Sequence, residues 1–230
     1  MIMSTMIGKF VVLDGTDGSG KTVHTEMLQK RLTAEGLVVH SIDFPRYEAE
    51  SAYFVKRYLN KEYGTPDEVG PYRASIFYAL DRFEHAPIIR KWLNERCVVI
   101  SNRYTSSNMG HQTGKIRGSA EREKFLNWLE DFEYRMLGIP KPDLHILLYM
   151  PPEIGQQLVD QKETLQQVGK RKRDAHEEDI NHLKNASEAY LYVARKYSWP
   201  VVYCTEKSAL RPLEVINEEI HRLFQEHGII

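Results

Sequence analysis

The segment from residue 15 to residue 22 has the residue types that proteins use to hold a chain of phosphates. It reads Gly15-Thr16-Asp17-Gly18-Ser19-Gly20-Lys21-Thr22, which fits the pattern G-x-x-x-x-G-K-[ST]. The glycines allow the backbone to curl so that its N–H groups point at phosphate oxygens. The lysine then reaches the β- and γ-phosphates of ATP, and the threonine hydroxyl ligates Mg²⁺. A glycine-rich surface turn would explain the glycines but not the adjoining Lys-Thr pair.

A strand must lead into this loop and a helix must follow it. Short apolar runs alternate with long amphipathic segments along the chain, which is typical of a parallel sheet covered by helices. Most of these runs are continuously apolar, as expected for strands that are buried on both faces. We predict one domain over residues 1–230 with the α/β, three-layer P-loop NTPase fold. Its parallel five-stranded sheet is expected at 9–14, 37–44, 97–101, 144–149 and 201–204, with helices on both faces, among them 121–137 and 179–197.

The overall charge and the cysteine content limit the class of protein. The chain has 230 residues, 31 Lys plus Arg, 32 Asp plus Glu and a net charge of -1. This balance argues against a protein that coats nucleic acid or an anionic membrane, and no segment approaches the ~20 apolar residues that span a bilayer. Cys97 and Cys204 both lie in apolar runs, which predicts buried free thiols. We therefore expect a cytoplasmic protein whose partners are neither nucleic acid nor membrane.

The remaining motifs decide between the classes of protein that contain this loop. A GTPase would need an N-K-x-D segment after a late strand, and the sequence has none. A motor ATPase usually ends an apolar strand with an acid, whereas here Asn102-Arg103-Tyr104 follows the third predicted strand. An arginine at the carboxyl end of a parallel strand lies where ligands bind in such sheets. Its planar guanidinium suits a phosphate. The sequence therefore points away from bulk ATP hydrolysis and leaves a kinase of nucleotides or of other small molecules.

Several motifs in order resemble the thymidylate kinases of the P-loop nucleoside monophosphate kinase family, nearly end to end. They are Asp17 inside the loop, Phe44-Pro45-Arg46-Tyr47 after the second strand, Tyr78 and Arg82 on one helix face, Asn102-Arg103-Tyr104 with the polar residues up to Gln112, and a basic segment at 170–173. The resemblance implies Mg²⁺-dependent transfer of the ATP γ-phosphate to dTMP by a homodimer. It also implies an acceptor site made of Asp17, Phe44, Pro45, Arg46, Tyr47, Tyr78, Arg82, Arg103, Asn108, His111 and Gln112.

The same resemblance assigns roles within that site. Arg103 and Arg46 clamp the acceptor phosphate, and Asp17 accepts a hydrogen bond from the sugar 3′-hydroxyl. Tyr78 stacks on the base and Arg82 donates to a base carbonyl. Without the resemblance, Tyr78 reads as a core tyrosine and Arg82 as an arginine paired with the nearby Asp81 or Glu84. Asn108 and Gln112 reach the base or the sugar.

The sequence departs from the family pattern at three positions. Asn102 replaces an acid that helps to organise Mg²⁺, so the expected metal ligands are Thr22 and Asn102. Gly18 stands where some members carry an arginine, so a basic lid at about 156–178 must supply it, and Arg171 and Arg173 join Lys21 and Arg103 as expected catalytic residues. His111 replaces a tyrosine that selects deoxyribose. A broader deoxynucleoside or nucleoside monophosphate kinase, or a non-catalytic nucleotide-binding regulator, therefore remains an alternative.

Overall fold

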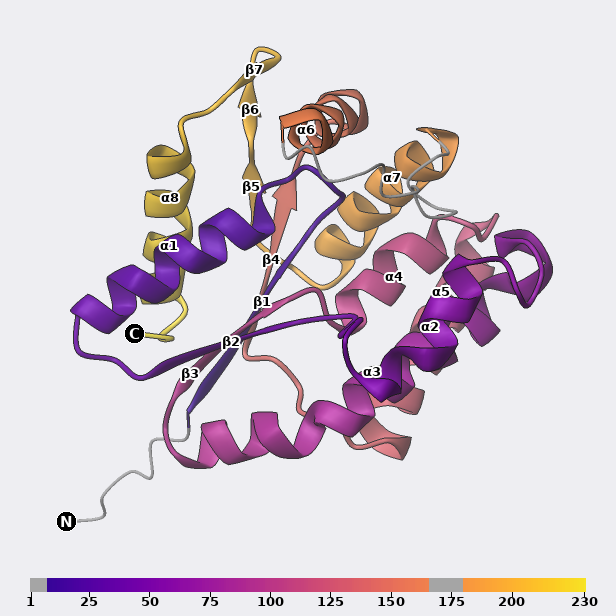
Figure 1. Cartoon of the computed structure of the whole chain (residues 1–230), viewed down its shortest axis with the longest axis horizontal. Coiled ribbons are helices and arrows are strands. Elements are labelled where there is room, and N and C mark those ends of the chain that lie inside the picture. Colours follow the sequence, from indigo (N-terminus) through magenta and orange to yellow (C-terminus); the bar gives the residue numbers. More distant parts are fainter. Residues whose placement is uncertain (1–7, 166–179) are drawn as a thin grey trace.

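The central sheet is parallel and has five strands in the order β2-β3-β1-β4-β5 (Figure 1). A computed structural model describes residues 8–165 and 180–230 of the chain. The strands of the sheet are β1 (Lys9–Asp14), β2 (Val39–Asp43), β3 (Val98–Asn102), β4 (Leu144–Tyr149) and β5 (Val201–Tyr203). A short antiparallel pair follows, made of β6 (Thr205–Glu206) and β7 (Ala209–Leu210).

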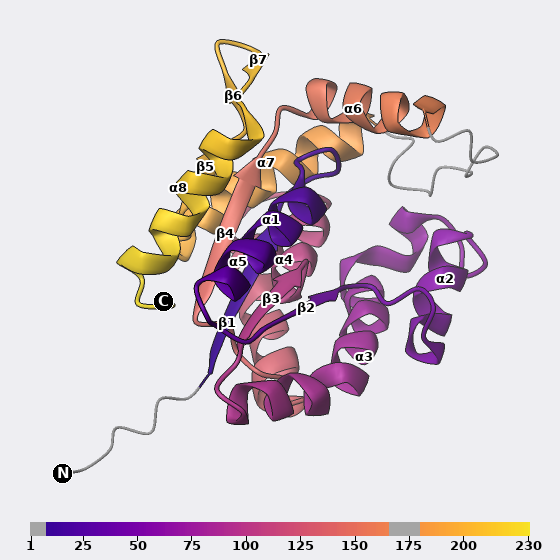
Figure 2. The ribbon, with the colours of Figure 1, turned by 60° about the vertical axis from the view of Figure 1, so that its left-hand side comes forward.

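Helices cover both faces of this sheet. On one face α1 (Lys21–Ala34) packs beside α8 (Leu213–Glu226), and the other face is covered by α3 (Pro66–Asn94), α4 (Thr105–Thr113) and α7 (Ile180–Lys196) (Figures 1 and 2). Helix α6 (Pro152–Leu165) runs outward from the end of β4 (Figure 2). The other helical segments are η1 (Glu50–Ala52), α2 (Tyr53–Leu59), α5 (Ser119–Glu130) and the π-helical η2 (Asp131–Met136).

Alternate residues of β1 build the two halves of the core. Val11 and Leu13 are fully buried against Leu28 of α1 and Phe224 of α8. Phe10 and Val12 face the opposite way, into a cluster that includes Ile89 of α3. Because successive side chains of a strand point to opposite faces, a strand that is apolar at every position must lie between two layers of helices.

The predicted fold is confirmed: the structure has an α/β sheet of five parallel strands between helices. The predicted strand boundaries differ from the observed ones by at most two residues. The predicted helix over 121–137 lies across two segments, α5 and the π-helical η2. The predicted lid at 156–178 begins within α6, and its catalytic candidates Arg171 and Arg173 lie outside the described residues.

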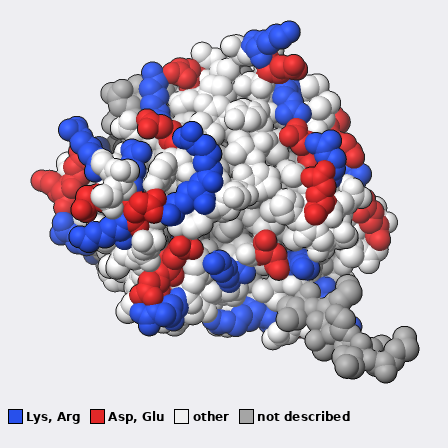
Figure 3. Space-filling model, turned by 180° about the vertical axis from the view of Figure 1, so that it is seen from behind, with Lys and Arg blue, Asp and Glu red and all other residues white. Residues whose placement is uncertain are grey.

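Charged side chains of both signs are interspersed on the face seen in Figure 3, rather than gathered in a patch of one sign. Cys97 and Cys204 are buried, and both are free thiols. Within residues 8–165 and 180–230, no helix is long and apolar enough to cross a membrane.

Candidate active site

The glycine-rich loop joins β1 to α1 in a conformation that only glycine adopts without strain. Gly15, Gly18 and Gly20 have φ angles of 148°, 77° and 81°. A Cβ atom on Gly15 would lie 2.3 Å from the carbonyl oxygen of Leu148, and one on Gly18 would lie 2.3 Å from that of Gly155. The loop is therefore packed closely against the end of β4 and the start of α6.

Lys21 lies over this loop and is held by its carbonyl groups. Its Nζ donates to the carbonyl oxygens of Gly15, at 3.0 Å, and Thr16, at 2.9 Å. Burial and the nearby Arg103 lower the pKa of Lys21 to about 8. Its ammonium is thus poorly solvated before a nucleotide binds, which favours its pairing with phosphate oxygens.

Arg103 brings the end of β3 to the same loop. Its backbone has a φ of 63°, and its N–H donates to the Leu13 carbonyl of the neighbouring strand at 3.0 Å. A positive φ is uncommon outside glycine, and the side chain of this residue contacts both the glycine-rich loop and α4. The Arg103 guanidinium donates through Nη2 to Asp17 and lies 3.1 Å from His111 Nε2 through Nη1.

The two contacts of Arg103, which directly follows β3, connect Asp17 of the phosphate loop with His111 of α4. Burial opposes ionisation of Asp17, but the positive charges of Arg103 and Lys21 prevail and hold its pKa well below the usual range. Since an arginine can only donate, His111 accepts through Nε2 and carries its proton on Nδ1. The guanidinium is thereby positioned beside the loop, where a second phosphate would bind.

Asp14, the last residue of β1, is a buried acceptor that ties three elements together. It is 1% exposed and receives hydrogen bonds from Ser106 at 2.5 Å, Ser107 at 2.8 Å, Tyr190 at 2.8 Å and the Gly15 N–H at 2.8 Å. Sequence reasoning missed this role. The sequence contained an indication of it, because Asp14 is an acid at the end of an apolar strand and would need buried donors such as the Ser106-Ser107 pair.

The Phe44-Pro45-Arg46-Tyr47 element leaves β2 at the same edge of the sheet. Phe44 is buried and its bond to Pro45 is cis. The backbone N–H of Arg46 donates to Asp81 of α3 at 2.8 Å, whereas the Arg46 and Tyr47 side chains are exposed. The turn is therefore anchored through its backbone, and the Arg46 guanidinium is left accessible to an anion.

Arg82 is paired with a carboxylate, but neither neighbour suggested by the sequence is the partner. Its Nε and Nη2 donate to Glu133 at 2.6 and 2.5 Å, and the two side chains are 2% and 0% exposed. Asp81 bonds to the Arg46 turn instead, so the suggested pairing with Asp81 or Glu84 is wrong. Glu133 lies 51 positions away in the π-helical turn, and sequence reasoning gave no indication of it.

Three other predicted acceptor residues lie on α3 and α4. Asn108 donates through Nδ2 to the Ser75 carbonyl and to Glu133, both at 3.1 Å. Gln112 is 1% exposed, and its Oε1 has no hydrogen-bond partner. Tyr78 is half-buried, with its ring edge-on to Tyr58 at a centroid distance of 6.2 Å.

The two predicted metal ligands differ in accessibility. Thr22 is exposed in the first turn of α1, whereas Asn102 is 6% exposed and accepts from Thr25 at 2.5 Å through Oδ1. The described parts of the chain contain no cluster of three or more His, Cys, Asp or Glu side chains that could hold a metal ion. Of the two predicted ligands, Thr22 is thus the accessible one.

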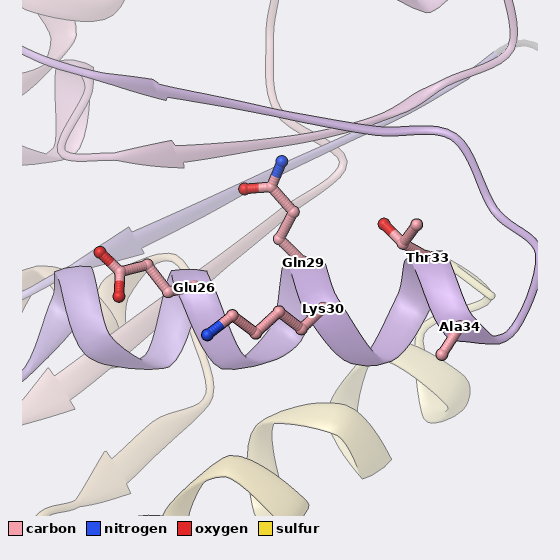
Figure 4. A pocket seen from close by; sticks show the side chains of 5 residues that line it. All are labelled: Glu26, Gln29, Lys30, Thr33 and Ala34. Atoms are coloured by element: carbon pink, nitrogen blue, oxygen red, sulfur yellow. The ribbon is translucent and has the colours of Figure 1, made fainter.

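A hollow of about 730 Å³ lies elsewhere, along α1 (Figure 4). Its lining is Glu26, Gln29, Lys30, Thr33 and Ala34. It contains no residue of the glycine-rich loop and mixes one acid with one base. We therefore place the active site at the carboxyl ends of β1 and β3 and not in this hollow.

A parallel sheet whose first strand ends in a phosphate-binding loop, with an arginine from the adjacent strand beside it, defines a P-loop nucleotide kinase. A model of the thymidylate kinase family matches residues 13–220. The chain belongs to the thymidylate kinase family.

Several known proteins are similar to this chain. A thymidylate kinase of Mycobacterium tuberculosis is 28% identical over 185 residues, covering 80% of this chain and 85% of that protein. The human thymidylate kinase is 26% identical over 148 residues, covering 64% of each. In structure, the chain resembles a thymidylate kinase of Candida albicans with a TM-score of 0.70 at 16% identity, over 97% of this chain and 93% of the other. This last likeness concerns the fold.

Proposed function

We propose that this chain transfers the γ-phosphoryl group of ATP to dTMP through the residues that meet at the ends of β1 and β3. The observation that carries the proposal is the contact of Arg103 with Asp17. In this contact the Arg103 guanidinium lies next to the glycine-rich loop, which supports the proposal that it binds the acceptor phosphate beside the donor nucleotide. One anion binds on the loop and the other on Arg103, as a transfer between two phosphates requires.

In the reaction, an oxygen of the dTMP phosphate forms a bond to the γ-phosphorus as the bond from that phosphorus to the β-bridging oxygen breaks. The products are dTDP and ADP. Lys21 leaves the loop carbonyls to neutralise the β- and γ-phosphates, while Arg103 and the exposed Arg46 hold the attacking phosphate. Asp17 holds Arg103 in place and accepts from the sugar 3′-hydroxyl.

Magnesium, when bound, neutralises charge on the phosphate oxygens. Thr22 is the residue best placed to ligate it. Asn102 contributes to the metal site indirectly, because it accepts a hydrogen bond from Thr25, which lies three positions after Thr22 on α1. Some members of the family carry an arginine at the position of Gly18, and this chain does not. We therefore propose that Arg171 or Arg173 supplies the positive charge that stabilises the transition state.

The substrate is tested by measuring ADP release over a range of concentrations of dTMP, dUMP, UMP, AMP, CMP and GMP. We expect the highest kcat/KM with dTMP. Faster turnover of AMP, CMP or GMP would refute the proposed substrate.

His111→Tyr should raise the ratio of dTMP to UMP turnover if the smaller histidine admits a ribose 2′-hydroxyl, and an unchanged ratio would exclude that role.

A non-catalytic regulator is distinguished from an enzyme by Lys21→Ala. An enzyme should lose turnover and keep its fold, because within the described structure the hydrogen bonds of Lys21 Nζ all go to residues of the glycine-rich loop itself, namely Gly15, Thr16 and Ser19. Absence of turnover in the unaltered protein, with ATP still bound, would support the regulator.

We also propose a cytoplasmic homodimer that packs through helices. Leu80 and Phe83 of α3 are 37% and 47% exposed and lie three positions apart, on one side of the helix. Light scattering should give twice the chain mass, and Leu80→Glu should yield monomers. A monomer in the unaltered protein would refute the dimer.

A further inference from the structure

Two glycines allow helix α7 to lie directly against helix α4 (Figures 1 and 2). A Cβ atom on Gly110 would lie 2.5 Å from the ring of Tyr190, and one on Gly114 would lie 2.9 Å from the carbonyl oxygen of Asn185. Contacts this short leave no room for a larger side chain at either position. The residue after Gly110 is His111, and the close approach of the helices brings its side chain against α7.

The ring of His111 contacts two rings of α7. The ring of His182 lies nearly parallel to it, with the centroids 5.8 Å apart and an angle of 14° between the planes. The ring of Tyr190 meets it edge-on, at 5.4 Å and 83°, and both arrangements are ones that aromatic pairs prefer. Tyr190 is itself fixed, because it is 1% exposed and its hydroxyl donates to Asp14 at 2.8 Å. His182 and Tyr190 together therefore set the plane of the His111 ring.

The plane of this ring determines how the Arg103 guanidinium is held. His111 Nε2 accepts from Arg103 Nη1 at 3.1 Å, while Nη2 of the same guanidinium donates to Asp17. A single contact would let the guanidinium turn, whereas contacts at two nitrogens fix both its position and its plane. Most of its five N–H donors remain for an anion, and the Arg103 side chain is 18% exposed.

We propose that His182 is a positioning residue of the acceptor site. Its ring holds His111 in the plane in which His111 accepts from Arg103, and the guanidinium is thereby held in place for the acceptor phosphate. The inference rests on the proposed function for the identity of that phosphate, which belongs to dTMP. A positioning role differs from the selection of deoxyribose, because it affects every acceptor nucleotide alike.

The test compares two substitutions of His182. His182→Ala removes the ring and should raise the KM for dTMP about threefold to tenfold, the range that one aromatic pair contributes. The kcat should stay within about twofold of the unaltered protein, because Arg103 holds the phosphate both before and during transfer. His182→Phe keeps a flat ring at the same place, so it should restore the KM for dTMP.

Lys184→Ala is the matched control on the same helix. Lys184 forms an ion pair with Glu153 of α6 at 3.0 Å, so its removal weakens the packing of α7 on α6 rather than on α4. The KM for dTMP in Lys184→Ala should equal that of the unaltered protein. The KM for ATP should stay unchanged in His182→Ala, and an equal rise in both KM values would show a general loss of structure and overturn the inference.

A double substitution tests whether the two histidines act through one contact. His111→Leu removes the acceptor and should raise the KM for dTMP about tenfold, the equivalent of one hydrogen bond to a charged group. His182→Ala should add little in that background, because both changes act on Arg103. An unchanged KM for dTMP in His182→Ala, a His182→Phe variant that is equally impaired, or fully additive effects would overturn the inference.

Nuclear magnetic resonance of the ligand-free protein separates this inference from the proposed function. The Nη protons of Arg103 should be resolved from those of mobile arginines, because two contacts slow the rotation of the guanidinium, and Arg103→Lys identifies their signal by its loss. The signal should merge with the others in His182→Ala and persist in His182→Phe. A protein that behaves in this way but releases no ADP with dTMP would refute the proposed function alone, whereas a signal that His182→Ala leaves unchanged would overturn the inference.

Discussion

The buried carboxylate of Asp14 offers the clearest test of how the active site is held together. Asp14→Ala removes the acceptor for four donors, namely Ser106, Ser107, Tyr190 and the Gly15 N–H. The serine hydroxyls can rotate toward other acceptors. The Tyr190 hydroxyl and the Gly15 N–H cannot easily do so, and each unpaired buried donor costs about 1–3 kcal/mol.

Two such donors amount to a loss of about 4 kcal/mol in the free energy of unfolding. For a chain of this size, 1 kcal/mol shifts the melting temperature by about 2–4 °C, so Asp14→Ala should melt about 8–16 °C below the unaltered protein. Asp14→Asn keeps the shape and one acceptor and should lose about 1–2 kcal/mol. Ser107→Ala removes a single donor and should cost less than about 1 kcal/mol.

Thermal melts followed by circular dichroism at fixed pH would measure these differences. Asp14 is also one of the charges that partly offset the lowering of the Lys21 pKa by burial and by Arg103. Asp14→Asn should therefore lower that pKa further, and with it the upper pH limit of ATP use. A melting temperature for Asp14→Ala within 2 °C of the unaltered protein, far below the expected shift of about 8–16 °C, would refute the reasoning.

Three further predictions concern the phosphate site. Gly18→Ala should lower the free energy of unfolding by about 2–4 kcal/mol and raise the KM for ATP, because a residue in the left-handed region gains a Cβ that overlaps Gly155. A chemical denaturation curve that coincides with that of the unaltered protein would contradict this. In the free enzyme, kcat/KM for ATP should fall above about pH 8, where Lys21 loses its proton; a profile that is flat to pH 10 would exclude Lys21 as the controlling group. Arg103→Lys should lower kcat/KM for dTMP about 10–100-fold, since one ammonium cannot replace both the Nη2 contact to Asp17 and the Nη1 contact to His111. Steady-state kinetics with full activity would show that a point charge suffices.

Much of the fold follows from local patterns in the sequence. Strands β1, β3 and β4 are continuous apolar runs, and such runs are the direct consequence of burial on both faces. The glycine-rich loop is likewise local, because its conformation depends on residues that adjoin in sequence. The short pair β6 and β7 was not predicted, since strands of two residues leave no periodic signal.

The site was harder to predict wherever its partners are distant in sequence. The placement of Lys21 and Arg103 at one edge of the sheet could be predicted, because each follows a strand of a parallel sheet. The pairing of Arg82 with Glu133 could not, because a contact across 51 positions leaves no mark in either local segment. The π-helical turn that presents Glu133 inward is set by packing rather than by a recognisable motif.

The hydrogen bond from the Arg103 N–H to the Leu13 carbonyl links the chain immediately before the phosphate loop to the residue that would bind the second phosphate. Adjacent strands of a sheet are about 4.8 Å apart, a separation set by their hydrogen bonds. The spacing of β1 and β3 thus sets the distance between the loop proposed to bind the donor phosphates and the arginine proposed to bind the acceptor phosphate. Because Arg103 follows β3 and the phosphate loop follows β1, substitutions on α3 or α4 leave this spacing, and with it the proposed geometry of transfer, unchanged.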